Sequence, residues 1–102
     1  MNRIEIKSER DLENAIEKSF EGKVLIFKHS TRCGISRMAL KGFESDLENS
    51  SYDSYYYLDL IAYKALSNEI AEKFRVKHES PQLLYVENGE VDLHQSHHKI
   101  SV

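Results

Sequence analysis

The sequence predicts an α/β domain in which a mixed sheet carries helices on both faces. Three observations lead to this fold class. Strand-like and helix-like segments alternate along most of the 102 residues, which is typical of parallel strands joined by helices. The apolar run at 24–27 is typical of a strand buried on both faces. Asn88-Gly89, between two strand-like segments, predicts a hairpin turn and therefore an antiparallel edge.

The first half of the chain predicts two strands and two helices. Alternating apolar residues predict a short strand over 3–7, and Ser8 is a good N-cap for a helix whose apolar positions reach Phe20. After the strand at 24–27, helical spacing over 35–48 predicts a second helix. The apolar residues at this spacing are Ile35, Met38, Ala39, Phe43 and Leu47.

The second half predicts three strands and one helix. The aromatic stretch YYYLDL at 55–60 predicts a half-buried edge strand, which explains its three tyrosines more simply than an interaction surface does. A third helix is predicted over 65–74, and the hairpin strands over 83–86 and 91–94. The predicted order is therefore β-α-β-α-β-α-β-β, in a single domain spanning 1–102.

Composition narrows the class of protein. One cysteine permits no internal disulfide, so a reducing, cytoplasmic setting is expected. The net charge of −3 gives no reason to expect nucleic acid as a partner. No apolar run is long enough to cross a membrane, and the N-terminus lacks the apolar region of a secretory signal.

The single cysteine, Cys33, stands where the second helix is expected to begin. A helix N-terminus favours the thiolate, which is the nucleophile in disulfide exchange. The window 22–43 contains five cations and no acid, which favours the thiolate further and argues against the alternative of an inert, buried cysteine. Ser36, one turn later, can offer the sulfur a hydrogen bond but no disulfide. The cations are Lys23, Lys28, Arg32, Arg37 and Lys41.

A cysteine between the second strand and the second helix, in this order of elements, resembles the thioredoxin fold. That family has a cis-proline just before its fourth strand, and Pro81, the only proline, stands there. The resemblance implies a cis bond between Ser80 and Pro81, in a loop that faces Cys33 and pairs with a thiol substrate. Thioredoxin-like domains usually begin a last helix near the position of Val102, where this sequence ends, so the C-terminal helix is expected to be truncated, short or missing.

Three motifs in sequence order, FKHSTRCGIS, HESPQ and HQSH, resemble those of the monothiol bacilliredoxin family, thioredoxin-like redox proteins of the bacillithiol system. The resemblance covers nearly the whole chain. Gly34 departs from it, because the family usually has proline there. The matching positions are Phe27 to Thr31, Cys33, Ile35, Ser36, His78 to Gln82, His94, Ser96 and His97.

The resemblance implies a monothiol thiol–disulfide oxidoreductase. The Cys33 thiolate would remove a small thiol, bacillithiol in preference to glutathione, from mixed disulfides on client proteins. No bound cofactor is implied. The implied partners are S-thiolated client proteins, the small thiol, and a flavin-dependent thiol–disulfide reductase that acts on the released disulfide. The expected supporting residues are Lys28, Thr31, Arg32 and Ser36, and the expected substrate-binding residues are Ser80, Pro81, Gln82 and His97.

Two other functions stay open. Cys33-Gly34-Ile35-Ser36 is similar to the C-G-F-S motif of monothiol glutaredoxins, which carry an iron–sulfur cluster between two subunits. The second open function is that of a non-catalytic thioredoxin-like adaptor. His29 and His78 are candidate modulators of the cysteine. The histidines near the C-terminus, His94, His97 and His98, match no standard zinc spacing, so no metal site is predicted.

Overall fold

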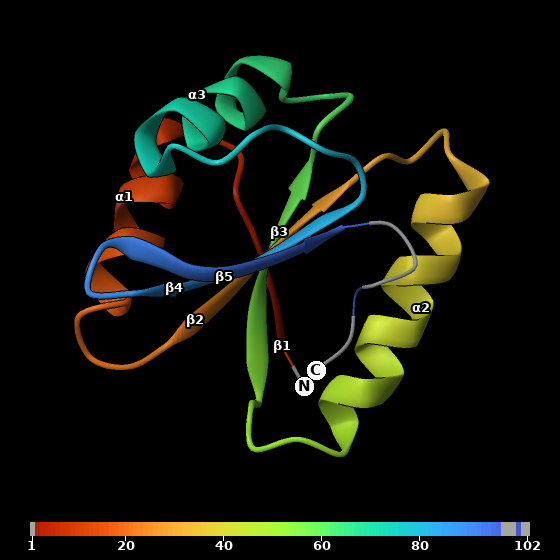
Figure 1. The fold of residues 1–102 in the computed structure, drawn as a ribbon, viewed down its shortest axis with the longest axis horizontal. Coiled ribbons are helices and arrows are strands. Elements are labelled where there is room, and N and C mark those ends of the chain that lie inside the picture. Colours follow the sequence, from red (N-terminus) through yellow and green to blue (C-terminus); the bar gives the residue numbers. More distant parts are fainter. Residues whose placement is uncertain (1, 97–99, 101–102) are drawn as a thin grey trace.

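A computed structural model describes residues 2–96 and 100, and within them a five-stranded mixed sheet lies between two helical layers (Figure 1). The first three strands in sheet order are parallel, whereas β4 and β5 run antiparallel to their neighbours. The predicted fold class and element order are confirmed. In sheet order the strands are β1 (Asn2–Glu5), β3 (Ser54–Asp59), β2 (Val24–His29), β4 (Gln82–Glu87) and β5 (Glu90–Ser96). The helices are α1 (Glu9–Lys18), α2 (Gly34–Glu48) and α3 (Lys64–Phe74).

The two faces of the sheet are covered by different helices. Figure 1 shows α2 on one face, and α1 and α3 on the other. Side chains of β2 alternate between the two faces, as those of any strand do. Leu25 and Phe27 join the core under α2, whereas Ile26 joins the core under α1 and α3. Burial of β2 on both faces explains why its sequence is continuously apolar over 24–27.

The tyrosine-rich strand β3 lies inside the sheet, so the expectation of an edge strand at 55–60 was wrong. It pairs with β1 on one side and β2 on the other. Tyr55, Tyr56 and Tyr57 are all buried, at 1%, 8% and 7% exposure, so they form core and not an interaction surface. Crossover connections set the order of parallel strands in a sheet, and the local sequence of a strand does not indicate its neighbours.

The buried stripe of α2 also differs from the expected one. Ile35 and Met38 were expected to face the core, but their side chains are 60% and 76% exposed. The expected Phe43 and Leu47 are buried, but in the first half of the helix the buried residues are Ser36 and Leu40. A rotation of the helix by about one residue is enough to exchange these faces, because successive residues are about 100° apart. Two apolar side chains are therefore left in solvent close to Cys33.

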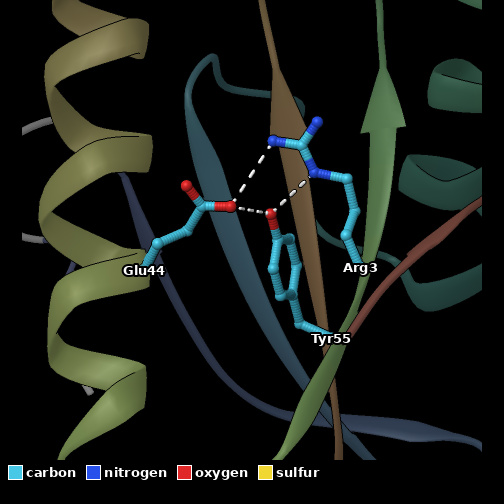
Figure 2. Close-up of polar contacts among 3 residues, drawn as sticks. All are labelled: Arg3, Glu44 and Tyr55. Carbon is cyan, nitrogen blue, oxygen red and sulfur yellow. Dashed lines mark hydrogen bonds and ion pairs between the residues drawn. The ribbon is translucent and has the colours of Figure 1, made fainter. Parts of the chain in front are cut away.

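A polar network fastens α2 to the sheet (Figure 2). The Tyr55 hydroxyl, on β3, donates to Glu44 Oε2 of α2 at 2.5 Å and accepts from Arg3 Nε at 3.0 Å. Arg3 Nη2 also lies 3.4 Å from Glu44 Oε2, and the guanidinium stacks 4.1 Å from the ring centroid of Tyr57. The pKa of Tyr55 is raised mainly by burial and, to a smaller extent, by the hydrogen bond to Glu44. The network therefore holds β1, β3 and α2 together through a neutral phenol.

The predicted hairpin is present, with Asn88 and Gly89 both at positive φ (53° and 77°), as a tight turn of this type requires. The region after Ser96 is described only at Ile100. The expected short or missing C-terminal helix therefore lies outside the described residues. Within the described part of the chain, no helix has the length and apolar character needed to span a membrane.

Candidate active site

The candidate site lies at the edge of the sheet where β2 ends and β4 begins. The two strands are antiparallel, and Lys28 pairs with Gln82 in their register. The loop that leaves β2 and the loop that enters β4 therefore emerge at the same edge of the sheet. The first of these loops carries Cys33 and the second carries Pro81. The fold thus brings together two of the three sequence motifs, which are separated by more than forty residues.

Cys33 is the N-cap residue of α2, as the sequence predicts, and its thiol is free and half-buried. Its backbone N–H donates to the Ser30 carbonyl at 3.2 Å, and its carbonyl accepts from the Arg37 N–H at 3.0 Å. The side chain makes no capping hydrogen bond, so the sulfur is not used to hold the helix end. The first turn contains no acidic residue that would oppose a thiolate.

Ser36 holds the cysteine loop together. The sequence allows its hydroxyl to offer a hydrogen bond to the sulfur of Cys33, and in the structure the hydroxyl bonds to other groups of the loop. Ser36 Oγ accepts from the Ser30 backbone N–H at 3.0 Å and lies 2.8 Å from His29 Nδ1. The residue is completely buried. These bonds join the end of β2 to the first turn of α2, and so define the loop on which Cys33 sits.

His29 is a buried, uncharged partner of Ser36. Its ring packs against Phe27 and Tyr57, with centroid distances of 6.3 and 5.7 Å. Burial is the main cause that lowers the pKa of His29, and the charges of Arg3 and Arg37 act in the same direction. A neutral ring shares one hydrogen with the Ser36 hydroxyl whichever of the two atoms carries it. The structure therefore assigns His29 to the support of the cysteine loop.

Lys28 was expected to support the thiol of Cys33 with its positive charge, and this expectation was wrong, because its side chain points away from the thiol. The side chain is completely buried and points to the face of the sheet that carries α3. Its ammonium donates to the Ser67 carbonyl at 3.3 Å and to His78 Nδ1 at 2.8 Å. Burial lowers the pKa of Lys28 from 10.5 to about 8. The alternation of side chains along β2 directs Lys28 away from α2.

His78 ties the proline loop to β2. An ammonium group only donates, so His78 Nδ1 accepts and the ring is neutral. Burial is the first cause that lowers the pKa of His78, and the charge of Lys28 is the second. Both effects favour the neutral, accepting ring. Lys28 and His78 belong to different sequence motifs, and their contact joins the two motifs in the fold.

The proline loop has the expected backbone. The peptide bond between Ser80 and Pro81 is cis, which confirms the prediction. Ser80 is half-buried and Pro81 is buried. Gln82 is also buried, and its side-chain amide donates to the Lys77 carbonyl at 3.0 Å, so it closes the loop from within. The predicted contribution of His97 lies outside the described residues, whereas His94 and Ser96 are on the edge strand β5.

Only part of the cationic window reaches the surface near Cys33. Lys23 is at the other end of β2 and pairs with Asp92 at 2.8 Å. Thr31 and Arg32 are exposed in the cysteine loop. Arg37 was not among the expected site residues, yet its Nη1 donates to the Thr31 carbonyl at 3.3 Å. Two features of the sequence could have identified Arg37 as a site residue: its position one turn after Cys33 and the absence of acids in the surrounding window.

Metal ligands are not clustered in the part of the chain that the structure describes. Among residues 2–96 and 100, no group of three or more histidine, cysteine, aspartate or glutamate side chains could hold a metal ion. His97 and His98, two of the three histidines near the C-terminus, fall outside this range.

The fold and the site define a class of protein, the thioredoxin-fold proteins with one cysteine at the start of the second helix. The Malassezia sympodialis thioredoxin superposes with a TM-score of 0.74 at 16% identity, covering 95% of this chain and 79% of its own. The Schistosoma mansoni thioredoxin gives 0.70 at 23% identity, covering 95% and 87%. At these identities the likeness shows the fold alone.

A sequence family within this fold class can also be assigned. Residues 4–102 match the monothiol bacilliredoxin family, BrxC, and the chain therefore belongs to that family. It is also 38% identical to a solved thioredoxin-fold protein with a suggested oxidoreductase activity, with a TM-score of 0.86, covering 98% of this chain and 87% of the other. Together with the free thiol at the start of α2, these relationships support a thiol redox function.

Proposed function

We propose that this protein is a monothiol disulfide reductase that removes bacillithiol from mixed disulfides on client proteins. The observation that carries the proposal is Cys33, a free, half-buried thiol at the N-cap of α2, in a chain of the monothiol bacilliredoxin family. Ser36 occupies the place of a second cysteine and is engaged in holding the loop. The chain therefore has no resolving thiol of its own.

The reaction would proceed by two thiol–disulfide exchanges. The Cys33 thiolate attacks the bacillithiol sulfur of the mixed disulfide, a new S–S bond forms, and the client cysteine leaves as a thiolate that takes up a proton. A second bacillithiol thiolate then attacks the bacillithiol sulfur held by Cys33. This releases the symmetrical disulfide and regenerates the Cys33 thiolate. No net oxidation of the protein occurs over the cycle.

The surrounding residues would serve this cycle in different ways. Ser80 and Pro81 would present the backbone against which the client's disulfide lies, and Lys28 with His78 would hold that loop to β2. Arg32 and Thr31 would line the approach to the thiol. The partners that we propose are S-thiolated proteins, bacillithiol rather than glutathione, and a flavin-dependent reductase for the released disulfide. A cytoplasmic location fits a chain with one cysteine.

The test is intact mass spectrometry after mixing the protein with a client that carries bacillithiol, and in parallel with one that carries glutathione. We expect Cys33 to gain the mass of bacillithiol while the client loses it, and Cys33→Ser to do neither. A preference for the glutathione-modified client would change the proposed co-substrate. If neither client loses its adduct, although Cys33 still reacts with a small alkylating agent, the proposal fails.

The alternatives have separate signatures. Gly34 after Cys33 is the one feature that favours an iron–sulfur carrier, and brown protein whose visible absorption disappears on chelation would support it. An adaptor role would be supported if Cys33→Ser left partner binding and cellular phenotype unchanged.

A further inference from the structure

An open hollow of about 530 Å³ lies on the exposed side of α2, next to the cysteine loop, and is lined by Gly34, Arg37, Met38 and Lys41. These four residues are spaced i, i+3, i+4 and i+7, so they share one face of the helix. The buried stripe lies on the opposite face. The hollow begins at the residue that follows Cys33 and extends about 10 Å along the helix axis, given the rise of about 1.5 Å per residue.

The hollow combines two cations with an apolar side chain. Arg37 is held over the cysteine loop, because its Nη1 donates to the Thr31 carbonyl at 3.3 Å while its Nη2 lies 3.8 Å from where a Cβ at Gly34 would be. Its guanidinium therefore spans the residues on both sides of Cys33. Lys41 is exposed one turn further on, and Met38 is 76% exposed between the two.

The lining of the hollow contains no acidic side chain. The window 22–43 contains no acid either, and two of its cations lie elsewhere. Lys23 pairs with Asp92, and Lys28 is buried toward α3. Arg37 and Lys41 are the cations that line the hollow, and carboxylates are the groups that complement them.

We propose that this hollow is the subsite for the carboxylate-bearing part of the small thiol while that thiol is bound to Cys33 as a mixed disulfide. Arg37 and Lys41 bind the carboxylates, and Met38 contacts the carbon skeleton. The hollow begins at Gly34, the residue after Cys33, so a small molecule joined to Cys33 by a disulfide lies next to it. This inference rests on the proposed function, and it deepens that function by naming the residues that select the thiol.

The step at this subsite is a redox-neutral exchange. One S–S bond breaks between the client cysteine and the small thiol, and one forms between Cys33 and the small thiol. The client leaves as a thiolate and takes a proton from water. Binding of the carboxylates holds the small thiol beside α2 as the client departs. Selection is therefore a property of the transferred group and not of the client.

The experiment compares two adducts on the same single-cysteine client, one with glutathione, which bears two carboxylates, and one with 2-mercaptoethanol, which bears none. The rate constants for adduct transfer to Cys33 are measured by intact mass in single-turnover mixtures. The selectivity is the ratio of the glutathione rate to the mercaptoethanol rate. We expect Arg37→Gln and Lys41→Gln each to lower this ratio about fivefold, the size of one exposed charge contact.

The controls separate charge recognition from a general effect. Lys23→Gln removes a cation of the same window at the far end of β2, and we expect its ratio to stay within about twofold of the unmodified protein's. Arg37→Lys keeps the charge and should recover part of the ratio. Repeating the measurement with bacillithiol as the adduct tests the same dependence on the proposed co-substrate.

Three results would overturn the subsite. The ratio could be as insensitive to Arg37→Gln and Lys41→Gln as to Lys23→Gln. A second contrary result uses a client whose acidic residues next to the cysteine are neutralised. If both transfer rates from this client fall while their ratio stays constant, the hollow contacts an acidic client and not the small thiol. Finally, transfer of neither adduct to unmodified Cys33 would refute the proposed function, and the subsite with it.

Discussion

At the scale of single residues, Ser36 is completely buried three residues after Cys33, where it shapes the loop that carries the thiol. Its hydroxyl accepts from the Ser30 N–H and lies 2.8 Å from His29 Nδ1. The hydroxyl therefore satisfies a buried backbone donor and a buried ring nitrogen at once. A position that a second cysteine would use for a disulfide is here used to shape the loop.

We expect Ser36→Ala to lower the free energy of unfolding by about 2 kcal/mol, because it leaves the buried Ser30 N–H without its acceptor. Chemical denaturation of both proteins gives this difference. The matched control is Ser45→Ala, the same change on the exposed side of the same helix, which should fall within about 0.5 kcal/mol of the unmodified protein. Equal effects of the two substitutions would show that the Ser36 hydroxyl is not needed for the loop.

At the scale of elements, the hairpin between β4 and β5 docks on the end of α1. Asn88 N donates to the Ser19 carbonyl at 2.8 Å, and Gly89 N donates to the Ser19 hydroxyl at 2.9 Å. Phe20 lies over the turn, and its ring would be 3.0 Å from a Cβ at Gly89. Phe20 was expected to continue the apolar face of the first helix, but α1 ends at Lys18 and Phe20 is 62% exposed.

Gly89→Ala is expected to lower the free energy of unfolding by about 1–2 kcal/mol, since it places a side chain at a φ of 77° and against Phe20. Thermal or chemical unfolding measures the loss. Gly42→Ala provides a control of opposite sign. A Cβ at Gly42 meets nothing within 4 Å on the exposed face of α2, so this variant should gain up to about 1 kcal/mol. A neutral Gly89→Ala would contradict the assigned strain.

At the scale of the whole molecule, buried titratable groups make stability depend on pH. Burial lowers the pKa of both His29 and His78 below the ordinary value of 6.5. Below pH 6.5 the unfolded chain therefore binds protons that the folded chain resists. The stabilisation that depends on these two neutral histidines is therefore fully present above pH 6.5, and it is lost as the pH falls through their lowered pKa values.

The pKa of Lys28, lowered to about 8, extends the same trend to alkaline pH. Between about pH 8 and 10.5 the unfolded lysine holds a proton that the folded one has lost, so the free energy of unfolding rises with pH. Denaturation at a series of pH values should show a rise of about 1–2 kcal/mol up to about pH 9.5. Above that, raised tyrosine pKa values, such as that of Tyr55, oppose the rise.

Lys28→Met is the variant that isolates this effect, because it keeps the length of the side chain and removes the titrating group. The alkaline rise should disappear in this variant, whereas the loss of stability below pH 6.5 should persist through His29. A rise of unchanged size in Lys28→Met would assign the alkaline trend to another group.

The sequence carried enough information for the order of the elements, the position of Cys33 at a helix start, the cis bond before Pro81 and the turn at Asn88-Gly89. The element order, the helix start and the turn depend on local chemistry, namely apolar periodicity and the freedom of φ at glycine, whereas the cis bond was implied by the resemblance to the thioredoxin fold. The three motifs placed the chain in its family by resemblance, and the family match over 4–102 agrees.

Tertiary structure alone decided which side chains meet. Crossovers placed β3 between β1 and β2 and buried its tyrosines. The rotation of α2 about its axis turned Ser36 inward and left Met38 in solvent. The pleat of β2 sent Lys28 to His78 and His29 to Ser36, although the two residues are adjacent in sequence. Apolar periodicity assigns a residue to one face of a helix or strand, but the packing of distant elements decides what that face contacts. The local chemistry of this protein was therefore readable along the chain, and the partners of its buried polar groups were not.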